Sequence, residues 1–130
     1  MNQTVNYNLI DSSAWLEYFA ETINSKPFIK PIENIKNIIL PTIIIFEVFK
    51  KISTERGENE ARIYITSMSN AHVIELDKEL SLSASMISIE YKLGMADSII
   101  YATALKYNAT LWTQDADFKG LKNVKYFEKK

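Results

Sequence analysis

Four acidic side chains occupy positions where folding alone gives little reason for a negative charge. Asp11 and Asp115 each follow a short apolar run of the kind that forms a buried strand. Glu47 interrupts an apolar helical segment, and Asp97 lies beside the apolar stripe of another. A carboxylate in such a segment is costly to bury unless another group pairs with it. These four acids are therefore the candidate functional residues.

If the four acids converge, their chemistry suits a divalent cation. Carboxylates packed together raise one another's pKa, and a bound cation removes that repulsion. Ligand sets made only of oxygen select hard ions such as Mg²⁺ or Mn²⁺. Such an ion makes water nucleophilic and neutralises the charge that builds on a phosphodiester. The chain has no cysteine and a single histidine, His72, so thiolate zinc sites and multi-histidine sites are excluded.

Each of these residues also has a purely structural interpretation. Asp97 in a first helical turn complements the helix dipole, and Glu47 could pair with Lys51 on a helix surface. Ser12 and Thr113 carry hydroxyl groups beside the acids, where they could orient carboxylates or water around a metal. The structural alternatives are a helix N-cap for Ser12 and an ordinary strand position for Thr113.

The hydrophobic pattern of the first half of the chain predicts two strands followed by helices. Thr42 is expected to cap the helix that carries Glu47, and Gly57 to end it. The segment 25–37, which contains two prolines, is expected to be a loop or a short helix. The other expected elements are strands at 6–10 and 38–40 and helices at 13–20, 42–56 and 59–70.

The second half continues the alternation of strands and helices. Gly94 is expected to end a helix that Asp77 caps. The expected elements are strands at 72–76, 109–113 and 124–127, helices at 78–92 and 96–107, and a turn or a single helical turn at 115–121. This alternation predicts an α/β fold of three layers, with a mainly parallel central sheet flanked by helices. Ligands bind such sheets at the carboxyl ends of the strands, where Asp11 and Asp115 are expected to face each other.

Length and charge limit the classes of protein that the chain can belong to. A chain of 130 residues suits one domain, 1–130. A net charge of −1 gives no case for binding nucleic acid through bulk positive charge. The segment 1–8 lacks the basic and apolar regions of a secretory signal, and no apolar stretch approaches the roughly 20 residues of a membrane span. We therefore expect a cytoplasmic protein without membrane contact, and the missing cysteines fit a reducing compartment.

Four segments, taken in order, resemble the motifs of the PIN-domain ribonucleases. The acids within them are separated by 36, 50 and 18 residues. The resemblance runs from about Tyr7 to Phe127 and is closest to the VapC type, the toxin half of bacterial and archaeal toxin–antitoxin pairs. The segments are Leu9-Ile10-Asp11-Ser12-Ser13, Pro41 to Val48, Ala96 to Ala104 and Leu111 to Phe118.

This resemblance implies an endoribonuclease that depends on Mg²⁺ or Mn²⁺. The four acids of the family fall on Asp11, Glu47, Asp97 and Asp115. The metal ligands would be Asp11, Asp97 and Asp115, with Glu47 as a further ligand or as the base that orients water. Asp117 matches a nearby second carboxylate whose role varies in the family, and Thr113 matches a hydroxyl position that shapes the site.

The resemblance also implies protein partners. VapC-type proteins are usually held inactive by an antitoxin that covers a groove, and homodimers are common among them. Lys50 and Lys51 follow Glu47 and either hold flanking phosphates of RNA or form a solvated helix face. The aromatic residues that either line an antitoxin groove or belong to the core are Trp15, Phe19, Phe46 and Phe49.

The sequence is also compatible with other functions. One is a housekeeping PIN nuclease in RNA processing, and another is a non-catalytic module that binds RNA or protein on the same fold. A phosphate-handling enzyme with an aspartate nucleophile is disfavoured, because no second aspartate stands two residues after Asp11. Dependence on metal distinguishes a nuclease from a binding module.

Overall fold

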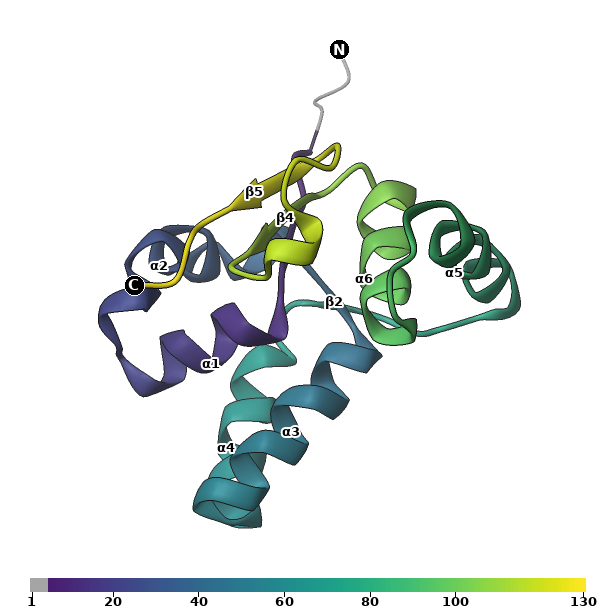
Figure 1. The fold of residues 1–130 in the computed structure, drawn as a ribbon. Helices are drawn as coiled ribbons and strands as arrows, with labels where there is room; N and C mark the ends of the chain where they lie inside the picture. The colour runs from purple at the N-terminus through teal and green to yellow at the C-terminus, as the bar shows by residue number, and fades with distance from the viewer. Residues whose placement is uncertain (1–4) are drawn as a thin grey trace.

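The computed structural model describes residues 5–130, and its centre is a five-stranded parallel sheet between layers of helices (Figure 1). The strand order is β3-β2-β1-β4-β5, and every neighbouring pair is parallel. The expected three-layer α/β fold is confirmed, with a sheet that is wholly parallel. The strands are β1 (Asn8–Ile10), β2 (Ile38–Pro41), β3 (His72–Ile74), β4 (Thr110–Thr113) and β5 (Val124–Tyr126). The expectation about a secretory signal falls partly on residues 1–4, which lie outside the described residues.

Within residues 5–130, six α-helices connect these strands. Two of them lead from β1 to β2, and two lead from β3 back to β4 in the opposite direction along the sheet. Because such crossovers are right-handed, the two pairs cover opposite faces of the sheet, as Figure 1 shows. The helices are α1 (Ser12–Ala20), α2 (Lys26–Glu33), α3 (Thr42–Arg56), α4 (Glu58–Met68), α5 (Lys78–Tyr91) and α6 (Met95–Lys106).

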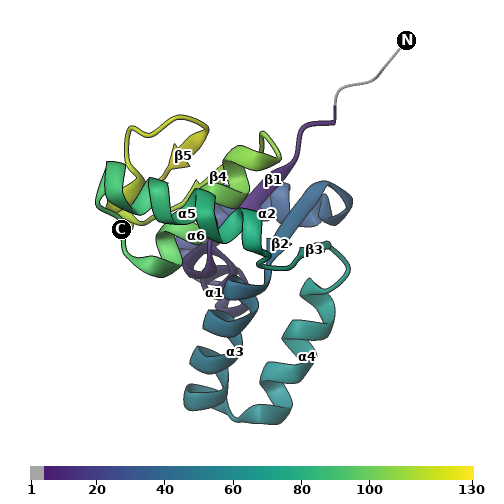
Figure 2. The same ribbon diagram turned by 90° about the vertical axis from the view of Figure 1, so that its right-hand side faces the viewer.

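The helices α3 and α4 form a hairpin that extends away from the sheet (Figures 1 and 2). Its inner face is apolar, with Ile44, Val48 and Ile52 buried on α3 and Ala61 and Met68 buried on α4. Its outer face carries ion pairs one helical turn apart, which contribute little to stability because their side chains are exposed. The base of α3, which carries Glu47, therefore stays close to the sheet while the tip of the hairpin projects.

The core lies around the central strands. All four residues of β2 are buried, as are Leu9 and Ile10 of β1. Continuous apolar runs are typical of parallel strands that have helices on both faces. Within residues 5–130, no helix is both long enough and apolar enough to cross a membrane.

The residues that cap α3 and α5 differ from the expectation. Pro41, not Thr42, is the N-cap of α3. The first N–H groups of a helix have no partner within the helix, and proline has no N–H group to leave unsatisfied. Its φ of −62° also suits the extended conformation of an N-cap residue. Lys92 ends α5 in a left-handed conformation with φ of 59°. Gly94 is instead the N-cap of α6, in an extended conformation. The segment 25–37 contains α2, whose first turn accommodates Pro27.

Candidate functional site

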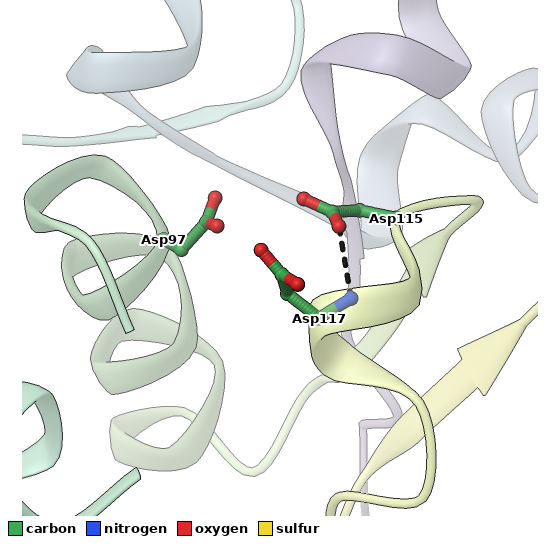
Figure 3. Close-up of side chains that lie close together, drawn as sticks. All are labelled: Asp97, Asp115 and Asp117. Atoms are coloured by element: carbon green, nitrogen blue, oxygen red, sulfur yellow. Dashed lines mark hydrogen bonds between the residues drawn. The ribbon is translucent and has the colours of Figure 1, made fainter. Parts of the chain in front are cut away.

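The four acids predicted from the sequence meet at the carboxyl edge of the sheet. Asp11 follows β1 and Asp115 follows β4, and these two strands are direct neighbours in the sheet. Glu47 lies in the second turn of α3, which begins directly after β2. Asp97 lies in the first turn of α6, whose start faces the same edge (Figure 3). The parallel topology thus brings together residues that are far apart in the chain.

Three carboxylates form the open part of the site. One carboxylate oxygen each from Asp97, Asp115 and Asp117 lies within 4.8 Å of the other two. The carboxylates point toward one another from α6 and from the 3-10 helix Ala116–Phe118 with its N-cap residue, Asp115 (Figure 3). The backbone N–H of Asp117 donates to Oδ1 of Asp115 at 2.9 Å. Asp117, expected only as a secondary residue, is therefore a member of this cluster, which among residues 5–130 does not include Asp11 or Glu47.

Asp11 forms the buried part of the site. Only 4% of its surface is exposed, and both of its carboxylate oxygens accept hydrogen bonds. Oδ1 accepts from the backbone N–H of Ser12 at 2.8 Å, and Oδ2 accepts from the hydroxyl of Thr113 at 2.7 Å. Asp11 itself is the N-cap of α1, so the expected capping role of the Ser12 side chain is wrong. The carboxylate of Asp11 therefore both caps α1 and belongs to the acidic site.

Thr113 links the two parts. Its buried hydroxyl donates to Asp11 and accepts from the backbone N–H of Asp115 at 2.9 Å. One hydroxyl group thus fixes the Asp11 carboxylate relative to the chain segment that carries Asp115. This geometry suits the orienting function expected for Thr113.

Desolvation and mutual repulsion raise the pKa values of the acids. Burial raises the pKa of Asp11 to about 6, against the hydrogen bonds from Thr113 and Ser12, which lower it. Burial also raises the pKa of Asp97 to about 6, and the nearby charges of Asp115, Asp11 and Asp117 raise it further. Shifts of this kind concentrate at functional sites, because folding alone gains nothing from crowded like charges.

Glu47 belongs to the same electrostatic group. Burial is the main cause that raises its pKa, the Ser12 hydroxyl lowers it, and the charges of Asp97 and Asp115 raise it. Its Oε1 atom is buried without a hydrogen-bond partner among residues 5–130. The alternative of a surface pair with Lys51 is wrong, because Lys51 pairs with Glu55 at 3.4 Å. A partly buried carboxylate with an unsatisfied oxygen is a feature that a ligand would satisfy.

Two residues beside the site, Gln114 and Glu17, were not predicted from the sequence. The Nε2 group of Gln114 donates to Oε2 of Glu17 on α1 at 2.8 Å. Glu17 Oε1 also accepts from the hydroxyl of Thr22 at 2.8 Å. The hydrogen bond between Gln114 and Glu17 is a second link between α1 and the segment that carries Asp115. The first is the hydrogen bond from Thr113 to Asp11, the N-cap of α1. The feature of the sequence that could have indicated this role is the polar side chain of Gln114, directly between Thr113 and Asp115.

The fold and the site together define a parallel α/β protein with a cluster of acids at the carboxyl edge of its sheet. A family model described as the PIN domain matches residues 9–124. The chain therefore belongs to the PIN domain family, whose members are nucleases. No curated protein matches the chain in sequence.

Solved structures with the same fold come from toxin–antitoxin complexes. A toxin–antitoxin complex from Klebsiella pneumoniae contains a chain with a TM-score of 0.78 and 23% identity, covering 94% of this chain and 99% of that one. VapBC2 from Rickettsia felis, bound to a promoter DNA fragment, matches with a TM-score of 0.72 and 16% identity over 94% and 98% of the two chains. VapBC-1 from nontypeable Haemophilus influenzae matches with a TM-score of 0.68 and 17% identity over 94% and 97%. These likenesses establish the fold.

Proposed function

We propose that this protein is a metal-dependent endoribonuclease and the toxin component of a VapBC-type toxin–antitoxin pair. The observation that carries the proposal is the group of three carboxylates, from Asp97, Asp115 and Asp117, within 4.8 Å at the carboxyl edge of a PIN fold. Membership of a nuclease family supports the reaction class. The likeness to chains of VapBC complexes over nearly the whole length supports the toxin role.

The residues present fit a divalent cation. The donor set contains only oxygen atoms, which suits Mg²⁺ or Mn²⁺. Several acids have raised pKa values, so the site carries repulsion that a cation would relieve. The unsatisfied Oε1 atom of Glu47 offers a further acceptor. We assign Asp11, Asp97 and Asp115 as the ligands, with Asp117 close enough to join them.

Each side chain has a distinct task in the proposed reaction. A bound cation supplies Lewis acidity, which makes water acidic and neutralises charge on the phosphate. Glu47 holds the attacking water and accepts its proton, a task that its raised pKa suits. Thr113 keeps Asp11 in place, and the Ser12 hydroxyl lowers the pKa of Glu47. Water attacks phosphorus in line and the 3′ oxygen leaves, so the products carry 5′-phosphate and 3′-hydroxyl ends.

The partners in this proposal are an RNA substrate, a cognate antitoxin and a second copy of the chain. The antitoxin role follows from the complexes in which the similar chains are found. Of the aromatic residues proposed for its groove, Trp15 is buried and belongs to the core. Phe19 stacks on Tyr64 of α4 with ring centroids 4.3 Å apart, next to a recess between α1, α3 and α4.

The experiment that tests the proposal is a cleavage assay with purified protein that is free of antitoxin. Structured RNAs are incubated with Mg²⁺, Mn²⁺ or EDTA, beside an Asp97→Asn variant. Glu58→Gln is the matched control, since it also removes one carboxylate charge but on the exposed face of α4. We expect cuts at discrete sites that require metal, persist in Glu58→Gln and disappear in Asp97→Asn.

Two results would contradict this proposal. Products with 2′,3′-cyclic phosphate ends would show that the 2′-hydroxyl of the RNA attacked, and water did not. Folded protein that binds RNA equally well with and without metal, and cuts none, would indicate a non-catalytic binding module.

A further inference from the structure

An aromatic ring lies exposed on the surface directly beside the acidic site. Phe46 leaves 59% of its surface exposed, although the next residue on α3 is the half-buried Glu47. An open recess of about 440 Å³ follows α3 at this point and is lined by Phe46, Glu47, Lys50, Lys51, Thr54 and Glu55.

A lysine accompanies the ring. The Nζ atom of Lys50 lies 5.8 Å from the centroid of the Phe46 ring, one helical turn further along α3. Within residues 5–130, Lys50 forms no ion pair with a carboxylate, whereas its neighbour Lys51 is paired with Glu55. The positive charge of Lys50 is therefore available to an anion that comes from outside the chain.

A ring and an unpaired cation side by side match the two parts of a nucleotide. Base–aromatic stacking tolerates any sequence because every base has a flat face, and lysine side chains contact the phosphates between the bases. Acids at the edge of the sheet that a bound cation does not neutralise repel an RNA backbone, and a flanking lysine offsets this repulsion. A polyanion satisfies Lys50, whereas an apolar protein segment would leave its charge unpaired.

We propose that Phe46 and Lys50 form a subsite on α3 for one nucleotide of the RNA strand, beside the phosphate that is cleaved. Phe46 stacks on the base, and Lys50 contacts the phosphate of the same strand. This inference rests on the proposed endoribonuclease function, and it names the part of the surface that receives the substrate.

The test measures binding of short fluorescent oligoadenylate and oligouridylate by anisotropy, with Mg²⁺ present and the Asp97→Asn change in every protein so that no RNA is cut. Phe46→Ala should weaken oligoadenylate binding about 5- to 10-fold, with a smaller loss for oligouridylate because uracil stacks less well. Phe46→Trp should restore the affinity. Neither change should alter the salt dependence, because neither removes a charge.

Lys50→Gln tests the second half of the subsite. On a single strand, each phosphate contact contributes about 0.7 to the slope of log K against log salt concentration, so this change should reduce the slope by about 0.7. Met86→Ala, which shortens an apolar side chain that is 65% exposed on α5, and Lys30→Gln on α2 are the matched controls. Both should leave affinity and slope unchanged.

The outcomes separate this inference from the function on which it rests. If wild-type protein cuts RNA but Phe46→Ala binds as well as its parent, the subsite is wrong and the nuclease stands. If Phe46→Ala changes only self-association, measured by sedimentation, the face belongs to a second copy of the chain, which also overturns the subsite. If wild-type protein neither cuts nor binds RNA, the proposed function fails and the subsite fails with it.

Discussion

Asp11 and Asp97 have pKa values that are both raised to about 6, but their surroundings are opposite. Asp11 is almost fully buried, and its carboxylate accepts hydrogen bonds from Thr113 and from the backbone of Ser12. Asp97 is half-buried, and within residues 5–130 its carboxylate accepts no hydrogen bond. Burial is the first cause in both cases, and neighbouring negative charges raise both pKa values, but only the shift of Asp11 is opposed by hydrogen-bond donors.

The difference shows that the buried half of the site, with Asp11, contributes to the stability of the fold, whereas the open half, with Asp97, does not. The contacts of Asp11 join β1, the start of α1 and the end of β4, so this carboxylate supports the local structure even without metal. Asp97 only adds repulsion until a cation binds. One acid is therefore expected to matter for both stability and function, and the other for function alone.

The largest expected effect separates the two acids by stability. Asp97→Ala and Asp11→Ala should each reduce cleavage roughly 10³-fold, because each removes a charge on which the reaction relies. In EDTA at pH 5, where Asp11 is mostly protonated and its buried charge adds no penalty, Asp11→Ala should lower the free energy of unfolding by about 1–3 kcal/mol, since it removes the N-cap and leaves the Thr113 hydroxyl without an acceptor. Asp97→Ala should leave that free energy unchanged or higher. Urea unfolding and the cleavage assay measure the two quantities.

A loss of stability in Asp97→Ala equal to that in Asp11→Ala would remove the distinction between the two halves. Adding Mg²⁺ provides the control, because a ligand that binds only the folded state raises its stability. Mg²⁺ should stabilise the wild-type protein and have little effect on Asp97→Ala.

The second prediction concerns the hydroxyl that joins the halves. Thr113→Val keeps the shape of the side chain but leaves Asp11 Oδ2 and the Asp115 N–H without their partner. Loss of such an orienting group costs about 10- to 100-fold in metal affinity or activity, and we expect a loss of that size here. Thr113→Ser retains the hydroxyl and should keep most of the activity. Equal activity in the valine and serine variants would show that the link is not needed.

The third prediction is the pH dependence of stability in metal-free protein. A carboxyl group with a folded pKa of about 6 and an unfolded value near 3.8 favours the folded state when it is protonated. The free energy of unfolding should therefore fall as pH rises from about 4.5 to 7, with Asp11 contributing on the order of 1–3 kcal/mol. Urea midpoints in EDTA at pH 5 and pH 7.5 test this, and Asp97→Asn should reduce the difference. A midpoint that rises over this range would show the opposite sign.

Topology explains why so much of the site is visible in the sequence. Asp11 and Asp115 follow apolar runs, and parallel strands place their carboxyl ends at one edge, so the convergence of these acids follows from the strand pattern. Glu47 stands out because an apolar segment surrounds it. The pattern could not show which side chains satisfy one another, because that depends on distances between elements that are far apart in the chain.

The remaining differences between prediction and structure arise where several neighbouring residues could take the same position. Several residues could cap α1 and α3, and the sequence does not show that Asp11 and Pro41 take these positions ahead of the neighbouring hydroxyl residues. The closeness of Asp117 to Asp97 depends on the short 3-10 helix after β4, which a turn-rich segment does not specify. The partner of Gln114 lies on α1, 97 residues away in the chain.

The smallest expected effect tests whether a contact with α1, in addition to β4, positions the segment that carries Asp115. The contact from Gln114 to Glu17 ties the segment that carries Asp115 to α1, and it is half-exposed. Gln114→Leu should lower the free energy of unfolding by about 0.5–1.5 kcal/mol, the usual net value of one hydrogen bond. Activity should fall less than 10-fold, below the effect of Thr113→Val, because Thr113 still holds Asp115 through its backbone. A double-mutant cycle with Glu17→Leu should give a coupling of at least 0.5 kcal/mol if the contact is formed. Additive effects would mean that the open half is positioned by Thr113 alone.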